Sequence, residues 1–106
     1  MFLLFKKEFH EAIRSGSKRQ TVRFWKRRPV KPGGHLYSPR LGKCLVTDIV
    51  EIDPAALTDE DARLDGFESV ETLHAKLVEM YGSVAPPDRK CFKLTFELLT
   101  GDAAAR

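Results

Sequence analysis

The chain has 106 residues, of which 42% are hydrophobic and 31% are charged, and its formal net charge is +3. This length and composition predict one compact globular domain and exclude a disordered chain. No apolar stretch approaches the roughly 20 residues that a transmembrane helix requires, and no cleavage site follows the apolar residues 1–5. We therefore expect a cytoplasmic protein with no membrane partner.

The net charge conceals a strong asymmetry between the two halves of the chain. Residues 1–50 hold twelve Lys and Arg against three Asp and Glu, and residues 51–106 hold six against twelve. The halves thus carry +9 and −6. The basic half is where an anionic partner is expected to dock.

The sequence offers no metal-binding pattern. Cys44 and Cys91 are far apart and belong to no CxxC motif, and His10, His35 and His74 form no ligand-like pair. We interpret both cysteines as buried free thiols and expect neither a metal nor a cofactor.

In chain order, the first half predicts a short strand at 3–5 and a helix at 8–15 that Gly16 ends. A β-branched and aromatic strand at 20–25 follows. Prolines and glycines make 29–34 a loop, and 35–38 is a second short strand.

The second half opens with the longest β-like run, 44–52, which we expect to be a central and largely buried strand. Thr58 and Asp61 form a capping-box pattern at the start of a helix over 58–64. A longer amphipathic helix is predicted at 69–81, and a last strand at 90–99. The domain thus spans 1–99, and 100–106 is expected to be a frayed tail.

About five short strands with inserted helices exclude a doubly wound α/β sheet, which needs regular alternation of strands and long helices. The pattern predicts an α+β fold built on a small, partly open barrel.

Two motifs resemble those of the ASCH family. The first is Gly16-x-Lys18-x-x-Thr21-x-Arg23, which leads from a helix into a strand, and the second is Asp65-Gly66-Phe67 before the 69–81 helix. A closing strand of the type Phe-Lys-Leu-Thr-Phe at 92–96 completes the resemblance. It implies a PUA-like β-barrel with a cleft that these motifs line.

The same residues suggest a site on chemical grounds. Alternation along the strand places Thr21 and Arg23 on one face, and Lys18 projects from the turn before it. An ammonium, a guanidinium fork and a hydroxyl suit a phosphate or a base edge. Alternatively, Arg23 pairs with Asp65 to brace the fold and Lys18 is solvated. Asp65 either faces this cluster or is a capping or surface carboxylate.

A basic segment after the strand extends the candidate nucleic-acid site. Trp25 stands beside several cations, a combination that single-stranded nucleic acid uses for stacking and phosphate contact, although burial of Trp25 is as compatible with the sequence. The candidate nucleic-acid-binding residues are Lys18, Arg23, Trp25, Lys26, Arg27, Arg28, Lys31 and Arg40.

Two functions remain open. The first is a module that binds single-stranded RNA or a nucleotide or nucleoside. The second follows from the resemblance, because one bacterial branch of the ASCH family hydrolyses N-acetylated cytidine with a Lys, a Thr and an acid. Those positions correspond to Lys18, Thr21 and Asp65, with Asp65 one methylene shorter than the Glu of that branch. The extended basic segment favours binding.

Overall fold

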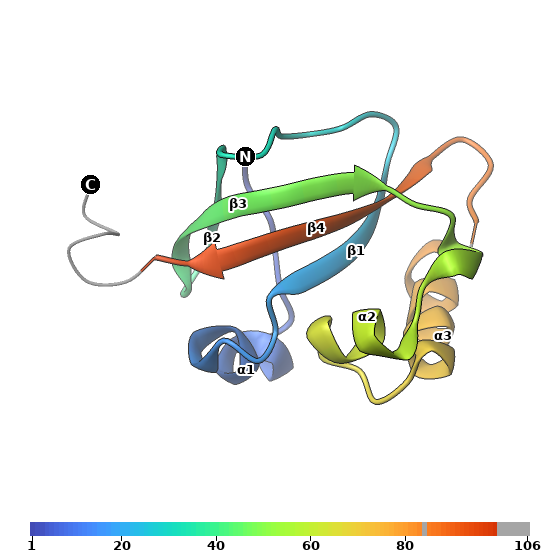
Figure 1. Cartoon of the computed structure of the whole chain (residues 1–106), viewed down its shortest axis with the longest axis horizontal. Coiled ribbons are helices and arrows are strands. Elements are labelled where there is room, and N and C mark those ends of the chain that lie inside the picture. Colours follow the sequence, from blue (N-terminus) through green and yellow to red (C-terminus); the bar gives the residue numbers. More distant parts are fainter. Residues whose placement is uncertain (84, 100–106) are drawn as a thin grey trace.

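The computed structural model describes residues 1–83 and 85–99 of the chain. These residues form an α+β structure in which four strands make one sheet (Figure 1). The elements are η1 (Lys7–Phe9), α1 (His10–Ser15), β1 (Gln20–Trp25), β2 (His35–Ser38), β3 (Gly42–Glu51), η2 (Pro54–Ala56), α2 (Asp59–Leu64), α3 (Val70–Tyr81) and β4 (Lys90–Leu98).

The sheet is antiparallel throughout, with the strand order β1-β4-β3-β2. It is curled into a half-barrel, and β1 is an edge strand. The helices lie on the β1 side of the sheet, with α1 toward one end and α2 and α3 toward the other (Figure 1). The α+β class is thus as predicted.

The prediction of about five strands is wrong for the described residues, which contain four. The segment at 3–5 forms no strand of its own. Phe2 makes a single parallel bridge to Tyr37, and Leu3 donates a backbone hydrogen bond to the same residue. The chain turns into η1 at Lys7, so it runs beside β2 too briefly to extend the sheet.

Strand β3 is central, as predicted, but its buried face changes partway along. A β-bulge between Val46 and Asp48 shifts the alternation, so that Val46 and Ile49 are buried. Val50, which unbroken alternation would place with Val46, is 36% exposed. The expectation of a largely buried strand therefore fails for its second half.

The helix ends follow the sequence signals. Gly16, Gly66 and Gly82 all have positive φ values, 85°, 92° and 77°, and each lies just beyond a helix or at its C-cap. Thr58 and Asp61 form the predicted capping box at the start of α2. These stops fix where the segments that follow α1 and α2 begin.

The core consists of two hydrophobic clusters, and alternation along β4 separates them. Phe92, Leu94 and Phe96 join the cluster under the N-terminal segment and α1, whereas Cys91 joins the cluster under α2 and α3. The thiols of Cys44 and Cys91 are both buried, as predicted, and burial raises their pKa values to about 11 and about 12. The two clusters approach each other at the outer edge of β1.

Among the described residues, no helix is long and apolar enough to cross a membrane. Residues 100–106, predicted to be a frayed tail, lie outside the described residues.

The bulge in β3 has a direct consequence for stability. Val46→Ala should lower the free energy of unfolding by about 2 kcal/mol or more, because Val46 is fully buried, whereas Val50→Ala should cost less than about 1 kcal/mol. Urea unfolding of the two variants compares the same substitution on one strand. Equal losses would contradict the bulged register.

Candidate functional site

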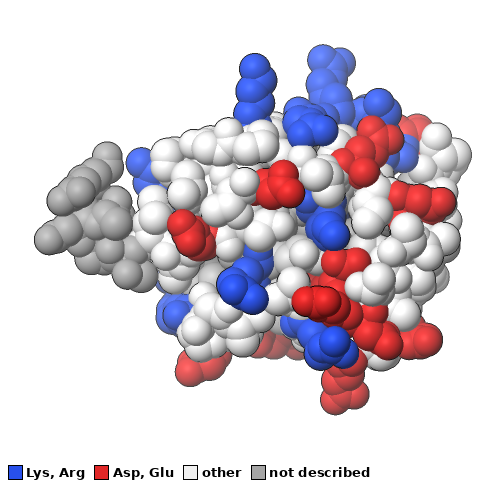
Figure 2. Space-filling model, in the orientation of Figure 1, with Lys and Arg blue, Asp and Glu red and all other residues white. Residues whose placement is uncertain are grey.

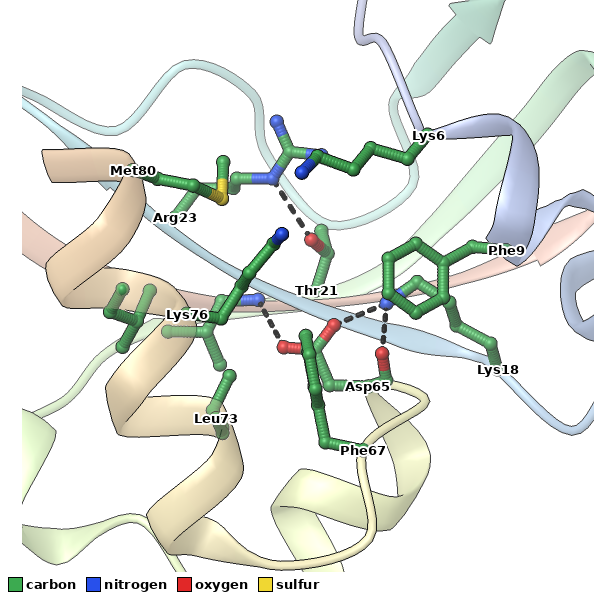
Figure 3. A pocket seen from close by; sticks show the side chains of 12 residues that line it. Lys6, Phe9, Lys18, Thr21, Arg23, Asp65, Phe67, Leu73, Lys76 and Met80 are labelled. Atoms are coloured by element: carbon green, nitrogen blue, oxygen red, sulfur yellow. Dashed lines mark hydrogen bonds and ion pairs between the residues drawn. The ribbon is translucent and has the colours of Figure 1, made fainter.

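A small pocket lies at the outer edge of β1, where the two hydrophobic clusters of the core approach each other (Figure 3). Strand β1 supplies one side, η1 and the turn after α1 a second, and the end of α2 with α3 the third. The residues that line it are Lys6, Phe9, Lys18, Thr21, Val22, Arg23, Asp65, Phe67, Leu73, Lys76, Leu77 and Met80.

A buried ion pair between Lys18 and Asp65 forms the inner end of this pocket. Their side chains are only 3% and 5% exposed. The Lys18 ammonium donates to Asp65 Oδ1, to the backbone oxygen of Asp65, and to the backbone oxygen of Gln20 at 3.1 Å. An ammonium has three hydrogens, so these three acceptors use all of them.

The ion pair also satisfies the free edge of β1. Asp65 Oδ2 accepts a hydrogen bond from the backbone N–H of Val22 at 3.2 Å. Gln20 and Val22 are two residues apart and therefore direct their backbone groups to the same edge of the strand. Lys18 and Asp65 thus cover an edge that would otherwise carry unpaired backbone groups, and they fasten the end of α2 to β1.

The position of Asp65 follows from the end of α2. Gly66 comes next in the left-handed conformation, and a Cβ at Gly66 would approach the ring of Phe9 to 3.0 Å. The backbone N–H of Arg19 meanwhile donates to the oxygen of Leu64. The acidic-Gly turn therefore delivers the Asp65 carboxylate to the strand, which places Asp65 in the cluster rather than on the surface.

Burial shifts the ionisation of both partners. It lowers the pKa of Lys18 and raises the pKa of Asp65, and in each case the charge of the partner opposes the shift. The charge of each group thus stabilises the charged form of the other.

Arg23 and Thr21 form the second contact in the pocket. Arg23 Nε donates to Thr21 Oγ1 at 3.1 Å, and Arg23 Nη2 donates to the oxygen of Leu4 at 2.8 Å. Burial lowers the pKa of Arg23, but a guanidinium stays protonated in proteins. Because the Thr21 hydroxyl accepts from Arg23, its own hydrogen is available to a ligand.

The alternative in which Arg23 pairs with Asp65 and Lys18 is solvated is wrong, since Lys18 holds the carboxylate.

Two further cations were missed by the sequence analysis. The side chains of Lys6 and Lys76 extend toward Arg23 and the Thr21 hydroxyl from opposite sides of the pocket (Figure 3). Lys76 follows Leu73 by three residues and precedes Met80 by four, so it falls within the apolar stripe of α3. A lysine within an apolar stripe is the sequence signal from which Lys76 could have been predicted as a pocket residue.

The pocket is narrow and its charge is unbalanced. Its accessible volume is about 50 Å³, which is room for a few water molecules. Among its lining residues, Asp65 is the one acid, whereas Lys6, Lys18, Arg23 and Lys76 are cations. Once Lys18 has neutralised Asp65, three positive charges remain within the lining, and Glu79 pairs with Lys76 from outside it.

Two aromatic rings form an apolar wall beside these charges. Phe9 and Phe67 pack edge to face, with centroids 5.5 Å apart, and Lys18 Nζ lies 4.8 Å from the centre of the Phe9 ring. The Phe9 ring limits water around the Lys18 ammonium, which strengthens its interaction with Asp65.

The predicted basic segment lies in the connection between β1 and β2. Lys26, Arg27 and Lys31 are exposed and take part in none of the ion pairs among the described residues. Arg28 is used differently, since its guanidinium donates to the oxygen of Ile49 at 2.6 Å. Figure 2 shows Lys and Arg side chains projecting along this edge of the molecule, whereas acidic side chains gather over α2 and α3.

Trp25 and Arg40 are placed less favourably for the predicted role. The half-buried ring of Trp25 packs against Phe92 and the core. Arg40 lies in the turn between β2 and β3, near Gly42 at the start of β3, whereas Arg28 contacts the far part of that strand. The structure does not bring Arg40 to the same end of the sheet as the basic segment.

The three candidate catalytic residues line one pocket, but their hydrogen bonds divide them differently. Lys18 is bound to Asp65 and Gln20, and the Thr21 hydroxyl is bound to Arg23. No hydrogen bond joins Lys18 Nζ to Thr21 Oγ1 in the part of the chain that is described. No group of three or more His, Cys, Asp or Glu side chains is arranged to hold a metal within that part either.

Comparisons with known proteins identify the fold. No family model and no curated protein sequence matches the chain. Three solved structures match it with high probability. The hypothetical protein PH0355 has a TM-score of 0.77 at 21% identity, over 92% of this chain and 97% of the other.

The other two structures extend the comparison to described families. Protein EF3133 from Enterococcus faecalis V583, of the family DUF984, has a TM-score of 0.65 at 16% identity over 87% of this chain and 70% of its own. An ASCH domain from Lactobacillus crispatus JV V101 has a TM-score of 0.61 at 12% identity, over 92% of this chain and 79% of the other. The chain therefore shares the fold of these structures, one of which is an ASCH domain. At these identities the likeness shows the fold alone.

The buried ion pair predicts a specific pattern of stability. Lys18→Met leaves the Asp65 carboxylate buried without its partner and should cost about 3–5 kcal/mol of unfolding free energy at neutral pH. Adding Asp65→Asn removes the unpaired charge and keeps an acceptor for Val22, so the double variant should recover a large part of the loss.

The stability of the single variant Lys18→Met should also change with pH in a definite direction. Burial raises the pKa of Asp65, and removal of Lys18 raises it further, so folded Lys18→Met binds more protons than the unfolded chain. Its stability is therefore highest below the ordinary pKa of Asp and is lost as the pH rises through the raised value. Urea unfolding of Lys18→Met between about pH 4 and 8, with the double variant as control, measures this slope. A loss below about 1 kcal/mol, or no slope relative to the double variant, would rule out a buried charge pair.

Proposed function

We propose that this protein is an RNA- or nucleotide-binding module that holds an anionic group of its ligand in the pocket beside β1. The surplus of positive charge in that pocket is the observation that supports the proposal. Lys18 is committed to Asp65, so Lys6, Arg23 and Lys76 remain to face an anion. A guanidinium and two ammonium groups are the side chains that proteins use for phosphate.

The hydrogen bonds around Thr21 support the same conclusion. Arg23 is held by Thr21 and by the oxygen of Leu4, which fixes the direction of its guanidinium before a ligand arrives. Pre-ordered donors lose less conformational entropy on binding than free surface side chains do. The pocket is thus organised for an anion in advance.

The basic segment gives the module a second contact for a longer ligand. Lys26 is three positions after Arg23, a span of about 10 Å along an extended chain. Lys26, Arg27 and Lys31 are exposed beyond the end of β1. A single strand of RNA anchored in the pocket would follow β1 to these cations, which makes single-stranded RNA the partner we propose.

The alternative, hydrolysis of N-acetylated cytidine, has weaker support. It requires Lys18 to take a proton from the Thr21 hydroxyl, yet the three hydrogens of the ammonium are directed to Gln20 and Asp65. The shorter side chain of Asp65 is also drawn back to the edge of β1. Release of acetate from N-acetylated cytidine by the purified protein would nevertheless establish this activity.

The proposal predicts that Arg23 determines affinity. Arg23→Gln should weaken binding of a short single-stranded RNA about tenfold or more, because charge-assisted hydrogen bonds to phosphate are removed. Fluorescence anisotropy at low salt measures the change. Arg63→Gln, which removes an exposed cation of α2 outside the pocket, is the matched control. RNA binding that is absent in the folded parent protein, or equal in the two variants, would refute the pocket as the site.

The basic segment should contribute a separate, salt-dependent part of the affinity. The double substitution Lys26→Ala and Arg27→Ala should reduce the slope of log affinity against log salt by about 0.7 for each phosphate that these side chains no longer neutralise. Arg28 is kept because it contacts the oxygen of Ile49. Titrations at several salt concentrations, again with an Arg63 variant as control, measure the slope. An unchanged slope would show that RNA does not reach this segment.

A further inference from the structure

We infer that the pocket recognises a phosphomonoester, the terminal phosphate of an RNA or of a nucleoside monophosphate, in preference to a phosphodiester within a strand. This inference rests on the proposed function and specifies which group of the ligand enters the pocket.

The number and arrangement of the cations point to such a group. The charged ends of Lys6, Arg23 and Lys76 point toward one another beside the Thr21 hydroxyl and come from three different elements of the chain (Figure 3). A terminal phosphate presents three unesterified oxygens and carries nearly two negative charges at neutral pH. A phosphodiester presents two such oxygens and one charge, so it would leave one cation unmatched.

The shape of the pocket leads to the same group. Its inner end is closed by the Lys18–Asp65 pair, and Phe9 and Phe67 close one side. An accessible volume of about 50 Å³ accommodates a group of a few heavy atoms, not a nucleobase with its ribose. A phosphodiester must have chain leaving it on both sides, whereas a terminal phosphate can enter a closed pocket from one side.

Among the described residues that line the pocket, no carboxylate pairs with Lys6 or Lys76. The ammonium groups of Lys6 and Lys76 point toward each other (Figure 3), and the neighbouring Lys76 lowers the pKa of Lys6. Glu79 contacts Lys76 at 3.4 Å, but its side chain is 68% exposed and lies outside the pocket lining. A dianion between the two amines would relieve this repulsion from inside the pocket.

The rest of the ligand would lie at the mouth of the pocket. Met80 is 47% exposed at the mouth, and its flexible side chain can move aside for a nucleoside. Nothing in this arrangement selects one nucleobase, because the fixed polar groups all face the phosphate. The preference should therefore be for the terminal group and not for sequence.

The test compares RNAs that differ only in their ends. An RNA of about ten nucleotides is prepared with a 5′-phosphate, with a 3′-phosphate, and with hydroxyls at both ends, and each is titrated by fluorescence anisotropy at equal salt. One of the phosphorylated forms should bind at least about tenfold more tightly than the hydroxyl form, since two or more charge-assisted contacts are added. The double substitution Lys6→Gln and Lys76→Gln should abolish that difference, whereas Lys7→Gln, which removes the neighbouring exposed cation outside this pocket, should preserve it.

The outcomes separate this inference from the proposed function. Equal binding of all three RNAs, with the weakening by Arg23→Gln retained, would overturn the terminal-phosphate inference and leave the RNA-binding proposal intact. A phosphate-dependent difference that survives Lys6→Gln with Lys76→Gln would overturn the assignment to this pocket. Failure of every RNA to bind would overturn both.

Discussion

The contact on which the site depends is the buried ion pair between Lys18 and Asp65. It joins the turn after α1, the end of α2 and the edge of β1, three segments that the sequence separates by up to 47 positions. Each charge is tolerated in the interior because the other is present, and the remaining donors and acceptors are used by Gln20 and Val22. The pair thus protects a sheet edge and fixes the floor of the pocket at the same time.

The charge of the pocket is a consequence of this pair. Lys18 is paired with Asp65, the one acid among the described residues of the lining. The positive surplus is therefore carried by Lys6, Arg23 and Lys76 nearer the mouth. A lysine and a carboxylate that resemble catalytic groups in the sequence therefore have a structural role here. Under the proposed function, binding involves residues that either lie outside the motif or occupy its last position.

Much of this arrangement could be predicted, and the failures have physical causes. The helix ends at Gly16 and Gly66 could be predicted because they depend on local backbone conformation. The end at Gly66 is what positions Asp65 beside the strand. The pairing within the site was left open by the sequence, because which cation reaches a carboxylate depends on burial and on tertiary packing. The exposure of Val50 could not be foreseen either, since the bulge shifts the alternation of a run that has apolar residues on both faces. Lys76 was overlooked because its stripe was interpreted only as a hydrophobic face.

The measurement that tests the account most directly is NMR of the lysine ammonium groups, observed with and without adenosine monophosphate and assigned with Lys→Gln variants. A buried, hydrogen-bonded ammonium exchanges its hydrogens with water slowly, so the Lys18 signal should be visible without ligand and should move little when ligand is added. The signals of Lys6 and Lys76 should shift or become visible only in the complex. A Lys18 signal that is absent without ligand, or that moves more than those of Lys6 and Lys76, would contradict the division between a structural pair and a binding surface.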